Sequence, residues 1–140
     1  MLTKAQIRSK ILEKLKTQKE DTRNRKSRTI LEKLLRQKEF IKAKVVMFYI
    51  AFDGEVNTEE MIKEAQKKGK IVTVPVVRQG SPLALSKVEV PVCKKNRVTL
   101  RPCILTDNLG LKKGPYGVCE PANKSFIRPK DLDLVIVPGI

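Results

Sequence analysis

Up to about residue 43, aliphatic side chains recur three or four positions apart, the spacing that gathers them on one face of a helix. The first of two predicted helices opens with Thr3 and Gln6 in the positions of a capping box and runs to about Lys19. The second has Asp21 or Thr22 as its candidate N-cap residue. The two apolar stripes are Ile7, Ile11, Leu12 and Leu15, and Ile30, Leu31, Leu34 and Leu35.

The pattern then changes to short apolar runs separated by turn residues, as in the strands of a sheet. Runs at 45–50 and 71–76 flank a predicted helix that starts at Asn57 or Thr58 and stops at Gly69. A strand, a helix and a second strand in that order form a βαβ unit, whose strands lie parallel.

Two later stretches complete the predicted sheet. The run 134–137 has the continuous apolar character of a buried parallel strand. The alternation between residues 80 and 106 predicts an antiparallel excursion or an edge of the sheet. We therefore predict an α/β fold with a mostly parallel sheet. It forms one domain over residues 1–140, divided into a basic N-terminal helical pair (1–43) and a sheet-containing part (44–140).

Composition narrows the class of protein. The 140 residues are 41% apolar, with no run long enough to span a membrane and no signal-peptide core. We therefore expect a cytoplasmic protein without a membrane partner. The chain has no histidine, and its three cysteines form no C-x-x-C pair. These features argue against a zinc site and against histidine acid–base chemistry, and we predict no metal ligand in the chain.

The formal net charge of +15 is concentrated at the N-terminus, where residues 1–44 hold fifteen basic and five acidic side chains. Such a field attracts nucleic acid, nucleotide phosphates or carboxylate-rich ligands. Lys4 and Arg8 lie one turn apart at the start of the first helix, facing the positive end of its dipole. A solvated helix face is the simplest interpretation of this pair, unless an anion neutralises it.

Glu55 follows the first predicted strand, at the carboxyl-end position where α/β proteins bind ligands. A turn carboxylate that helps to cap the next helix is an equally good interpretation. Ile50, at the end of the strand, is by position alone more typical of core than of a ligand-binding wall.

Five stretches, taken together and in order, resemble the 5-formyltetrahydrofolate cyclo-ligase family, also called 5,10-methenyltetrahydrofolate synthetases. The resemblance covers the chain outside residues 79–106. The stretches are Lys4-x-x-x-Arg8, Gly-Glu-Val-Asn-Thr at 54–58, Lys-Gly-Lys at 68–70 before a strand ending in Pro75, Gly-Pro-Tyr-Gly-Val-Cys-Glu-Pro at 114–121, and Asp-Leu-Asp-Leu-Val-Ile-Val-Pro-Gly at 131–139.

The resemblance implies a three-layer α/β/α domain of the NagB/RpiA/CoA-transferase-like kind. It also implies an ATP- and Mg²⁺-dependent conversion of 5-formyltetrahydrofolate to 5,10-methenyltetrahydrofolate, with release of ADP and phosphate. In this chemistry the formyl oxygen is phosphorylated first, N10 then attacks the activated carbon, and phosphate leaves. The basic surface could also favour polyglutamylated forms of the folate.

Residue by residue, the resemblance assigns ATP contacts to the first helix and folate contacts to Ile50 and Glu55. Tyr116 stands where the family carries a loop aromatic that would stack on the folate. No catalytic residue is assigned. The five ATP-contacting positions are Lys4, Ala5, Gln6, Ile7 and Arg8.

The family's phosphate-cradling loop, of the form G-x-G-x-G-Y-Y-D, does not occur in these 140 residues. Its neighbourhood supplies the Mg²⁺ ligands in the family. We therefore expect a C-terminally incomplete domain that does not turn over alone and that exposes an apolar sheet face or edge. Two alternatives are a non-catalytic folate- or nucleotide-binding derivative of the fold and a basic nucleic-acid-binding module. Charge alone supports the second, and we expect no nucleic-acid partner.

Overall fold

The computed structural model describes residues 2–52, 54–79, 98–106, 111–113, 119–122 and 124–139. Within these ranges, no helix is both long and apolar enough to cross a bilayer. The helices are α1 (Lys4–Lys16), α2 (Glu20–Leu35), α3 (Lys38–Lys42), α4 (Glu59–Lys67) and a 3₁₀ turn at Pro129–Asp131. The strands are β1 (Val45–Met47), β2 (Ile71–Gln79), β3 (Val98–Ile104), β4 (Leu111–Lys113), β5 (Cys119–Pro121) and β6 (Leu134–Val135).

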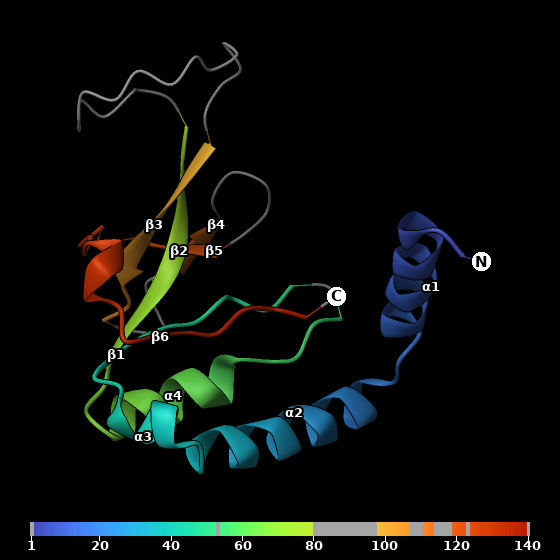
Figure 1. Ribbon diagram of the computed structural model, residues 1–140, viewed down its shortest axis with the longest axis horizontal. Helices are drawn as coiled ribbons and strands as arrows, with labels where there is room; N and C mark the ends of the chain where they lie inside the picture. The colour runs from blue at the N-terminus through green and yellow to red at the C-terminus, as the bar shows by residue number, and fades with distance from the viewer. Residues whose placement is uncertain are drawn as a thin grey trace.

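The main sheet has the strand order β3-β2-β1-β6 (Figure 1). Strand β1 pairs in parallel with β2 on one side and with β6 on the other, while β3 runs antiparallel to β2. This arrangement confirms the predicted α/β class with a mostly parallel sheet, and β3 forms the predicted antiparallel edge. The expected hairpin turn at residues 94–96 lies outside the described residues.

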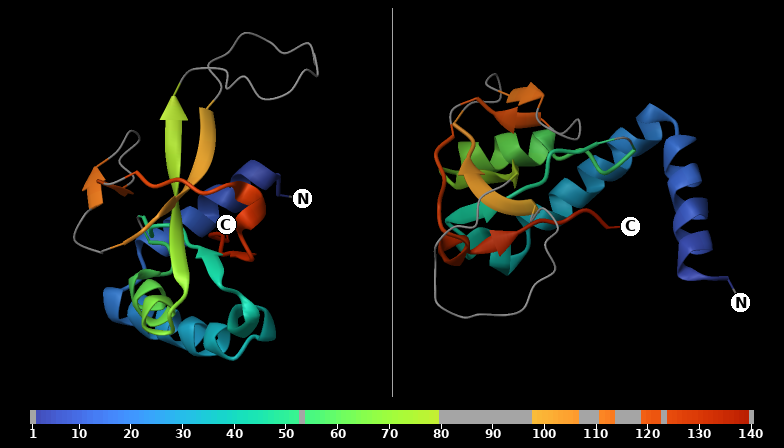
Figure 2. Two further views of the ribbon diagram at one scale, coloured as in Figure 1. Left: turned by 90° about the vertical axis from the view of Figure 1, so that its left-hand side faces the viewer. Right: turned by 90° about the horizontal axis from the view of Figure 1, so that it is seen from above.

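Helices α2, α3 and α4 gather on one side of the sheet, whereas α1 stands off from them (Figures 1 and 2). Alternate strand residues point toward these helices, because successive side chains of a strand face opposite sides. Val46 from β1, Phe48 just after it, and Val72 and Val74 from β2 are buried there. They share a single core with the helical side chains Leu31, Phe40, Met61, Ile62 and Ala65.

Local signals explain three of the helix boundaries. The capping box of α1 is present, with Thr3 N–H donating to Gln6 Oε1 at 2.8 Å. Helix α4 stops before Gly69, whose φ of +73° favours glycine. The prediction that Asp21 or Thr22 is the N-cap residue of the second helix is wrong. Helix α2 begins at Glu20, and its N-cap residue is Lys19, without a side-chain cap. Two acidic side chains in the first turn stabilise this earlier start through the helix dipole.

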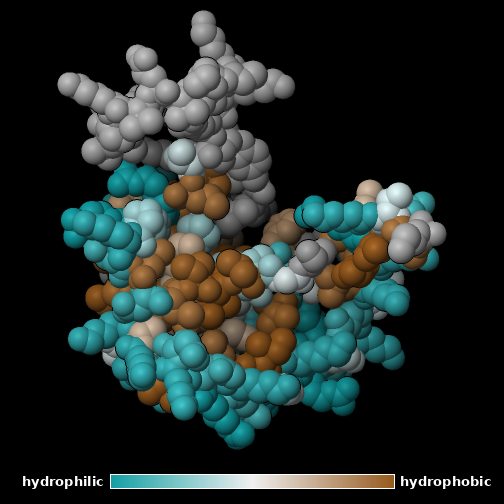
Figure 3. All heavy atoms as spheres, in the orientation of Figure 1, coloured by the Kyte–Doolittle hydropathy of each residue, from teal (hydrophilic) through white to brown (hydrophobic). Residues whose placement is uncertain are grey.

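Strand β6 is parallel to β1, as expected, but only one face of the run 134–137 is covered: Leu134 and Ile136 pack against the core. Val135 and Val137 are 41% and 71% exposed. In the described part of the chain β6 pairs only with β1, and these valines lie on the face opposite α2–α4. Figure 3 shows apolar side chains gathered across the middle of one face of the molecule.

Asp133 fixes the start of β6 against the start of β1. Its Oδ2 accepts hydrogen bonds from the backbone N–H groups of Lys44 and Val45, at 2.8 and 2.9 Å. These two bonds lower the pKa of the Asp133 carboxyl. Since β6 leads directly to Pro138 and Gly139, this anchor also sets where those two residues lie.

A ligand-sized cavity at the carboxyl end of strand β1

Glu55 lies in a tight turn just beyond β1. Its Oε2 accepts from the backbone N–H of Phe52 at 3.0 Å, and its own N–H donates to the Phe52 carbonyl at 3.1 Å. The interpretation that Glu55 caps α4 is therefore wrong. The N-cap residue is Thr58, without a side-chain cap, and the Oδ1 of its neighbour Asn57 accepts from the N–H of Glu59 at 2.9 Å. The second oxygen, Glu55 Oε1, has no hydrogen-bond or ion-pair partner among the described residues.

Glu55 lines a cavity of about 160 Å³, which we call the Glu55 cavity. Its walls come from four separate parts of the chain: the end of α1 and the linker after it, α2 from Arg23 to Ile30, the segment after β1, and the segment after β6. The lining residues are Leu15, Gln18, Arg23, Lys26, Ser27, Ile30, Tyr49, Gly54, Glu55, Val56, Pro138 and Gly139. It lies at the carboxyl ends of β1 and β6, the edge where α/β sheets bind ligands.

Gly54 allows α1 to close one side of this cavity. Its φ is +87°, and a Cβ at this position would lie 3.1 Å from the carbonyl oxygen of Leu15. A side chain here would therefore combine backbone strain with a tight contact that Leu15 must relieve by shifting a few tenths of an ångström. Glycine at position 54 lets the turn that carries Glu55 approach the end of α1 this closely.

Tyr49 supplies the aromatic wall of the Glu55 cavity. Its hydroxyl donates to the carbonyl of Val56 at 3.0 Å, while its own carbonyl accepts from the hydroxyl of Thr58 at 2.7 Å. Burial, and secondarily the negative charge of Glu55, raise the pKa of Tyr49 to about 12. The phenol is therefore neutral across the physiological range and fixed in place as a donor.

Two residues of the lining each carry a buried hydrogen-bond donor that has no acceptor among the described residues. The donors are Gln18 Nε2, from the linker between α1 and α2, and Arg23 Nε, from the first turn of α2. A buried donor without an acceptor is costly, and in native structures such a group calls for an explanation. The terminal nitrogen of Arg23 is 4.0 Å from Glu20, a solvent-exposed contact that leaves Nε unpaired.

The other predicted site residues lie elsewhere or outside the described residues. Ile50 is half-buried against the core and lines a different cavity, of about 310 Å³, between α4 and Leu105. Tyr116 lies outside the described residues. The structure thus places Ile50 and Glu55 on opposite sides of the segment that follows β1, and does not bring them into one cavity.

The predicted ATP-contacting residues occupy the first turns of α1 and are all exposed. Gln6 is engaged in the capping box, with its Oε1 accepting from Thr3. Lys4 and Arg8 have no ion pair among the described residues, and no acidic side chain lies in this first turn. Leu15 is seven residues beyond Arg8, so about 10 Å of helix separates that cation from the Glu55 cavity.

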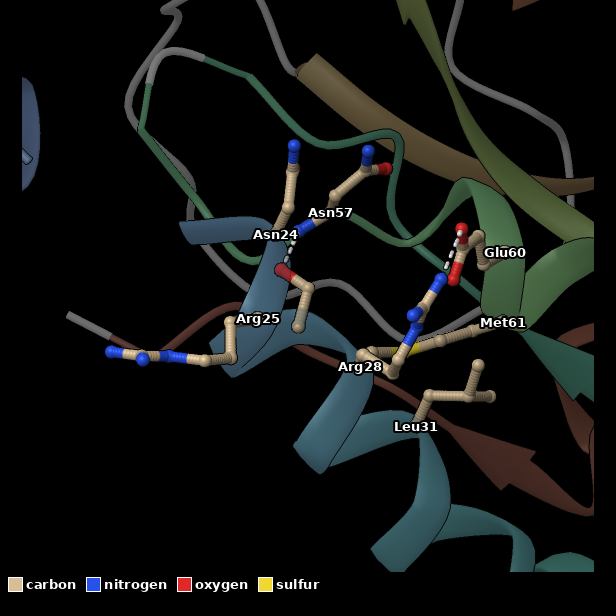
Figure 4. Close-up of a pocket in the computed structure, with 8 residues that line it drawn as sticks. Asn24, Arg25, Arg28, Leu31, Asn57, Glu60 and Met61 are labelled. Carbon is tan, nitrogen blue, oxygen red and sulfur yellow. Dashed lines mark hydrogen bonds and ion pairs between the residues drawn. The ribbon is translucent and has the colours of Figure 1, made fainter. Parts of the chain in front are cut away.

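A third cavity, of about 420 Å³, lies between α2 and α4 and shares Ser27 with the Glu55 cavity. Figure 4 shows Arg28 directed toward Glu60, at 4.0 Å, and Arg25 directed away from it. Asn24 and Asn57 also line this space, which we call the α2–α4 cavity. Across the described residues, no three Cys, Asp or Glu side chains gather closely enough to hold a metal ion.

From the sequence, Glu55 was a candidate site residue, whereas Tyr49, Gln18 and Arg23, which line the same cavity, were not. Tyr49 carried a usable signal, since an aromatic residue at the end of a strand beside a carboxylate is a natural cavity wall. Gln18 and Arg23 carried none, because their place in the cavity depends on how α1 and α2 pack against the segment after β1.

Comparison with known proteins places the chain in a family. A Caenorhabditis elegans protein, named as a probable 5-formyltetrahydrofolate cyclo-ligase, is 28% identical over 132 residues, or 89% of this chain and 56% of its own length. The NMR structure of Aquifex aeolicus 5,10-methenyltetrahydrofolate synthetase matches with a TM-score of 0.70 and 26% identity, over 97% of this chain and 60% of its own. This chain therefore spans less than two thirds of either relative. The family model of the 5-formyltetrahydrofolate cyclo-ligases matches residues 1–140, and the chain belongs to that family.

Proposed function

We propose that this protein converts 5-formyltetrahydrofolate to 5,10-methenyltetrahydrofolate at the expense of ATP, releasing ADP and phosphate. Family membership supports the reaction class. The single observation that carries the proposal is the carboxylate of Glu55, oriented by Phe52 and lining a cavity at the carboxyl end of β1.

Glu55 is proposed to bind the pteridine ring. The 2-amino group and the adjacent ring N–H of this ring form a pair of donors, and a carboxylate presents a matching pair of acceptors. The Phe52 N–H holds one oxygen and so fixes the plane of the carboxylate before any ligand arrives. Ile50 and Tyr116 stay proposed folate contacts, on the basis of the family resemblance.

The start of α1 is proposed to contact ATP. Lys4 and Arg8 add two cations at the positive end of the α1 dipole, where Thr3 already accepts from the N–H groups of Gln6 and Ile7. Ala5, Gln6 and Ile7 contribute the backbone of the same turn. Because no acidic side chain competes in this turn, a phosphate group would meet an unneutralised positive field.

The proposed reaction needs positioning more than covalent help from the protein. The formyl oxygen attacks the terminal phosphorus of ATP, the bond from that phosphorus to the bridging oxygen breaks, and ADP leaves. N10 then attacks the formyl carbon and loses its proton, and the carbon–oxygen bond to phosphate breaks. Glu55 would hold the pteridine while this occurs, which is catalysis by orientation. Mg²⁺ is expected with the nucleotide from the family resemblance, and no residue described here is assigned to it.

The α2–α4 cavity supports a preference for polyglutamylated folates. It adjoins the Glu55 cavity through Ser27, and Arg25 and Arg28 line it. A glutamyl carboxylate that extends from a ring bound at Glu55 could replace Glu60, 4.0 Å away, as the partner of Arg28. We expect the affinity gain from added glutamates to fall as salt rises, since the contacts are largely exposed.

An assay of methenyltetrahydrofolate formation tests the proposed reaction. It is run with ATP and Mg²⁺ on the protein as its gene encodes it, and on residues 1–140 alone. We expect turnover from the encoded protein, and none from residues 1–140, which contain no G-x-G-x-G-Y-Y-D loop. Saturable folate binding without turnover in either form would favour a non-catalytic folate-binding protein. The absence of both would overturn the proposal.

A further inference from the structure

The two donors without acceptors, Gln18 Nε2 and Arg23 Nε, come from separate elements, and both residues line the same cavity as Glu55. The lining of the Glu55 cavity therefore includes an acceptor, the carboxylate, and two residues that each carry an unpaired donor. Both donor nitrogens are shielded from solvent, so a ligand reaches them only when the side chains of Gln18 and Arg23 shift toward the cavity. A ligand that satisfies all of them must present donors to Glu55 and an acceptor to Gln18 and Arg23. This requirement is stricter than positive charge alone, since it specifies donors and acceptors on a single ligand.

The volume of the cavity limits the size of that ligand part. About 160 Å³ is well below the volume of sites that enclose a whole drug-sized molecule, so the cavity suits one ring system. Its walls also suit the faces of a flat ring, because Leu15, Ile30 and Val56 are aliphatic and Tyr49 is aromatic.

A 2-amino-4-oxopteridine has the required arrangement on one edge: two donors, the 2-amino group and the neighbouring ring N–H, followed by one acceptor, the 4-oxo oxygen. We propose that Gln18 and Arg23 donate to the 4-oxo oxygen of the folate ring while Glu55 accepts from its two donors. This inference rests on the proposed function and adds two positioning residues to it. Gln18 and Arg23 would fix which way round the ring lies, and hence where the N5-formyl group points.

The variants Gln18→Glu and Arg23→Lys test this assignment. The first replaces the amide donor by an acceptor of the same shape, and the second keeps the positive charge but removes the guanidinium Nε–H. Gln37→Glu and Arg36→Lys are matched controls, because both residues are exposed and lie outside the cavities described above. Each protein is titrated with 5-formyltetrahydrofolate and with 5-formyltetrahydropterin, which lacks the glutamyl tail.

We expect each of the two test variants to weaken the binding of both ligands about ten-fold, the loss typical of one hydrogen bond to a buried site, with no change for the controls. Unchanged binding of both ligands in both test variants, with Glu55→Gln still weakened, would overturn the roles of Gln18 and Arg23 while leaving the proposed function intact. A loss confined to the ligand with the tail would overturn the inference in the same way. If the wild type binds neither ligand, the proposed function falls as well.

Discussion

Gly54 lies against the carbonyl of Leu15, so closely that a Cβ on residue 54 would come within 3.1 Å of that oxygen. The contact joins the end of α1 to the turn that carries Glu55. At this point the basic helix α1 meets the Glu55 cavity, so the shape of the cavity depends on the position of α1.

Gly54→Ala is therefore expected to lower stability and to weaken folate binding. The positive φ costs about 1 kcal/mol or more for alanine, and the 3.1 Å approach to the Leu15 carbonyl adds to it because Leu15 must shift slightly. Gly69→Ala is the matched control: its φ is +73°, but a Cβ there meets nothing within 4 Å. Thermal unfolding and folate titration of both variants separate the two effects. Equal losses of binding would contradict the role given to the Leu15 contact.

The ionisation of Tyr49 reports on Glu55. The pKa of Tyr49 is raised to about 12 by burial and, secondarily, by the negative charge of Glu55. Replacing that charge in Glu55→Gln is expected to lower the pH at which the Tyr49 phenolate forms. The measurement is an ultraviolet pH titration in a Tyr116→Phe background, which leaves Tyr49 as the one tyrosine. An unshifted titration would mean that the carboxylate and the phenol are not neighbours.

Asp133 is expected to make stability depend on acid. The pKa of its carboxyl is lowered from 3.8 in the folded protein by the N–H groups of Val45 and Lys44. Its contribution is therefore fully present above the unfolded value of 3.8 and is lost as the pH falls through the lower folded value. Unfolding measured from neutral pH to below pH 3.8 should show this loss in the wild type, and a smaller loss in Asp133→Asn.

Asp131→Asn is the control for that experiment. The pKa of Asp131 is also lowered, chiefly by its hydrogen bond to Arg128, but both side chains are exposed and the pair does not join two strands. An exposed ion pair contributes little to stability. The account of β6 would be contradicted if Asp131→Asn changed the acid dependence as much as Asp133→Asn.

Glu120 is a structural carboxylate. It is 5% exposed, its Oε1 accepts from the N–H of Val77 at 3.1 Å, and its Oε2 lies 3.6 Å from Lys124. Truncation in Glu120→Ala leaves the Val77 N–H without this acceptor, and is expected to cost about 1–3 kcal/mol of unfolding free energy. Glu64→Ala removes an exposed contact with Lys67 and should cost much less. Denaturant unfolding of both variants checks the difference.

The sequence predicted most of the elements but little of their burial. Strong local signals, such as the capping box at Thr3 and the stop at Gly69, correspond to real helix ends. The apolar run 134–137 was predicted to be buried because its side chains are hydrophobic. A sequence pattern does not show whether a second layer covers both faces of a strand, and Val137 is exposed.

Some residues of the candidate site could also be predicted from the sequence, and others could not. Glu55 could be predicted because its position after a strand has a topological meaning that sequence preserves. Gln18 and Arg23 could not, since they reach the cavity only through the packing of α1 and α2. Ile50, whose folate contact came from the family resemblance, lines a separate cavity, and its position alone had indicated a core residue.

The central claim is that the Glu55 cavity binds the pteridine end of 5-formyltetrahydrofolate. A calorimetric titration of the wild type and of Glu55→Gln with this ligand tests it most directly. Gln keeps the shape of the side chain but replaces one acceptor by a donor, which would face the 2-amino group. We predict saturable binding by the wild type and a loss of at least about ten-fold in the variant. Equal affinity of the two proteins would contradict the claim.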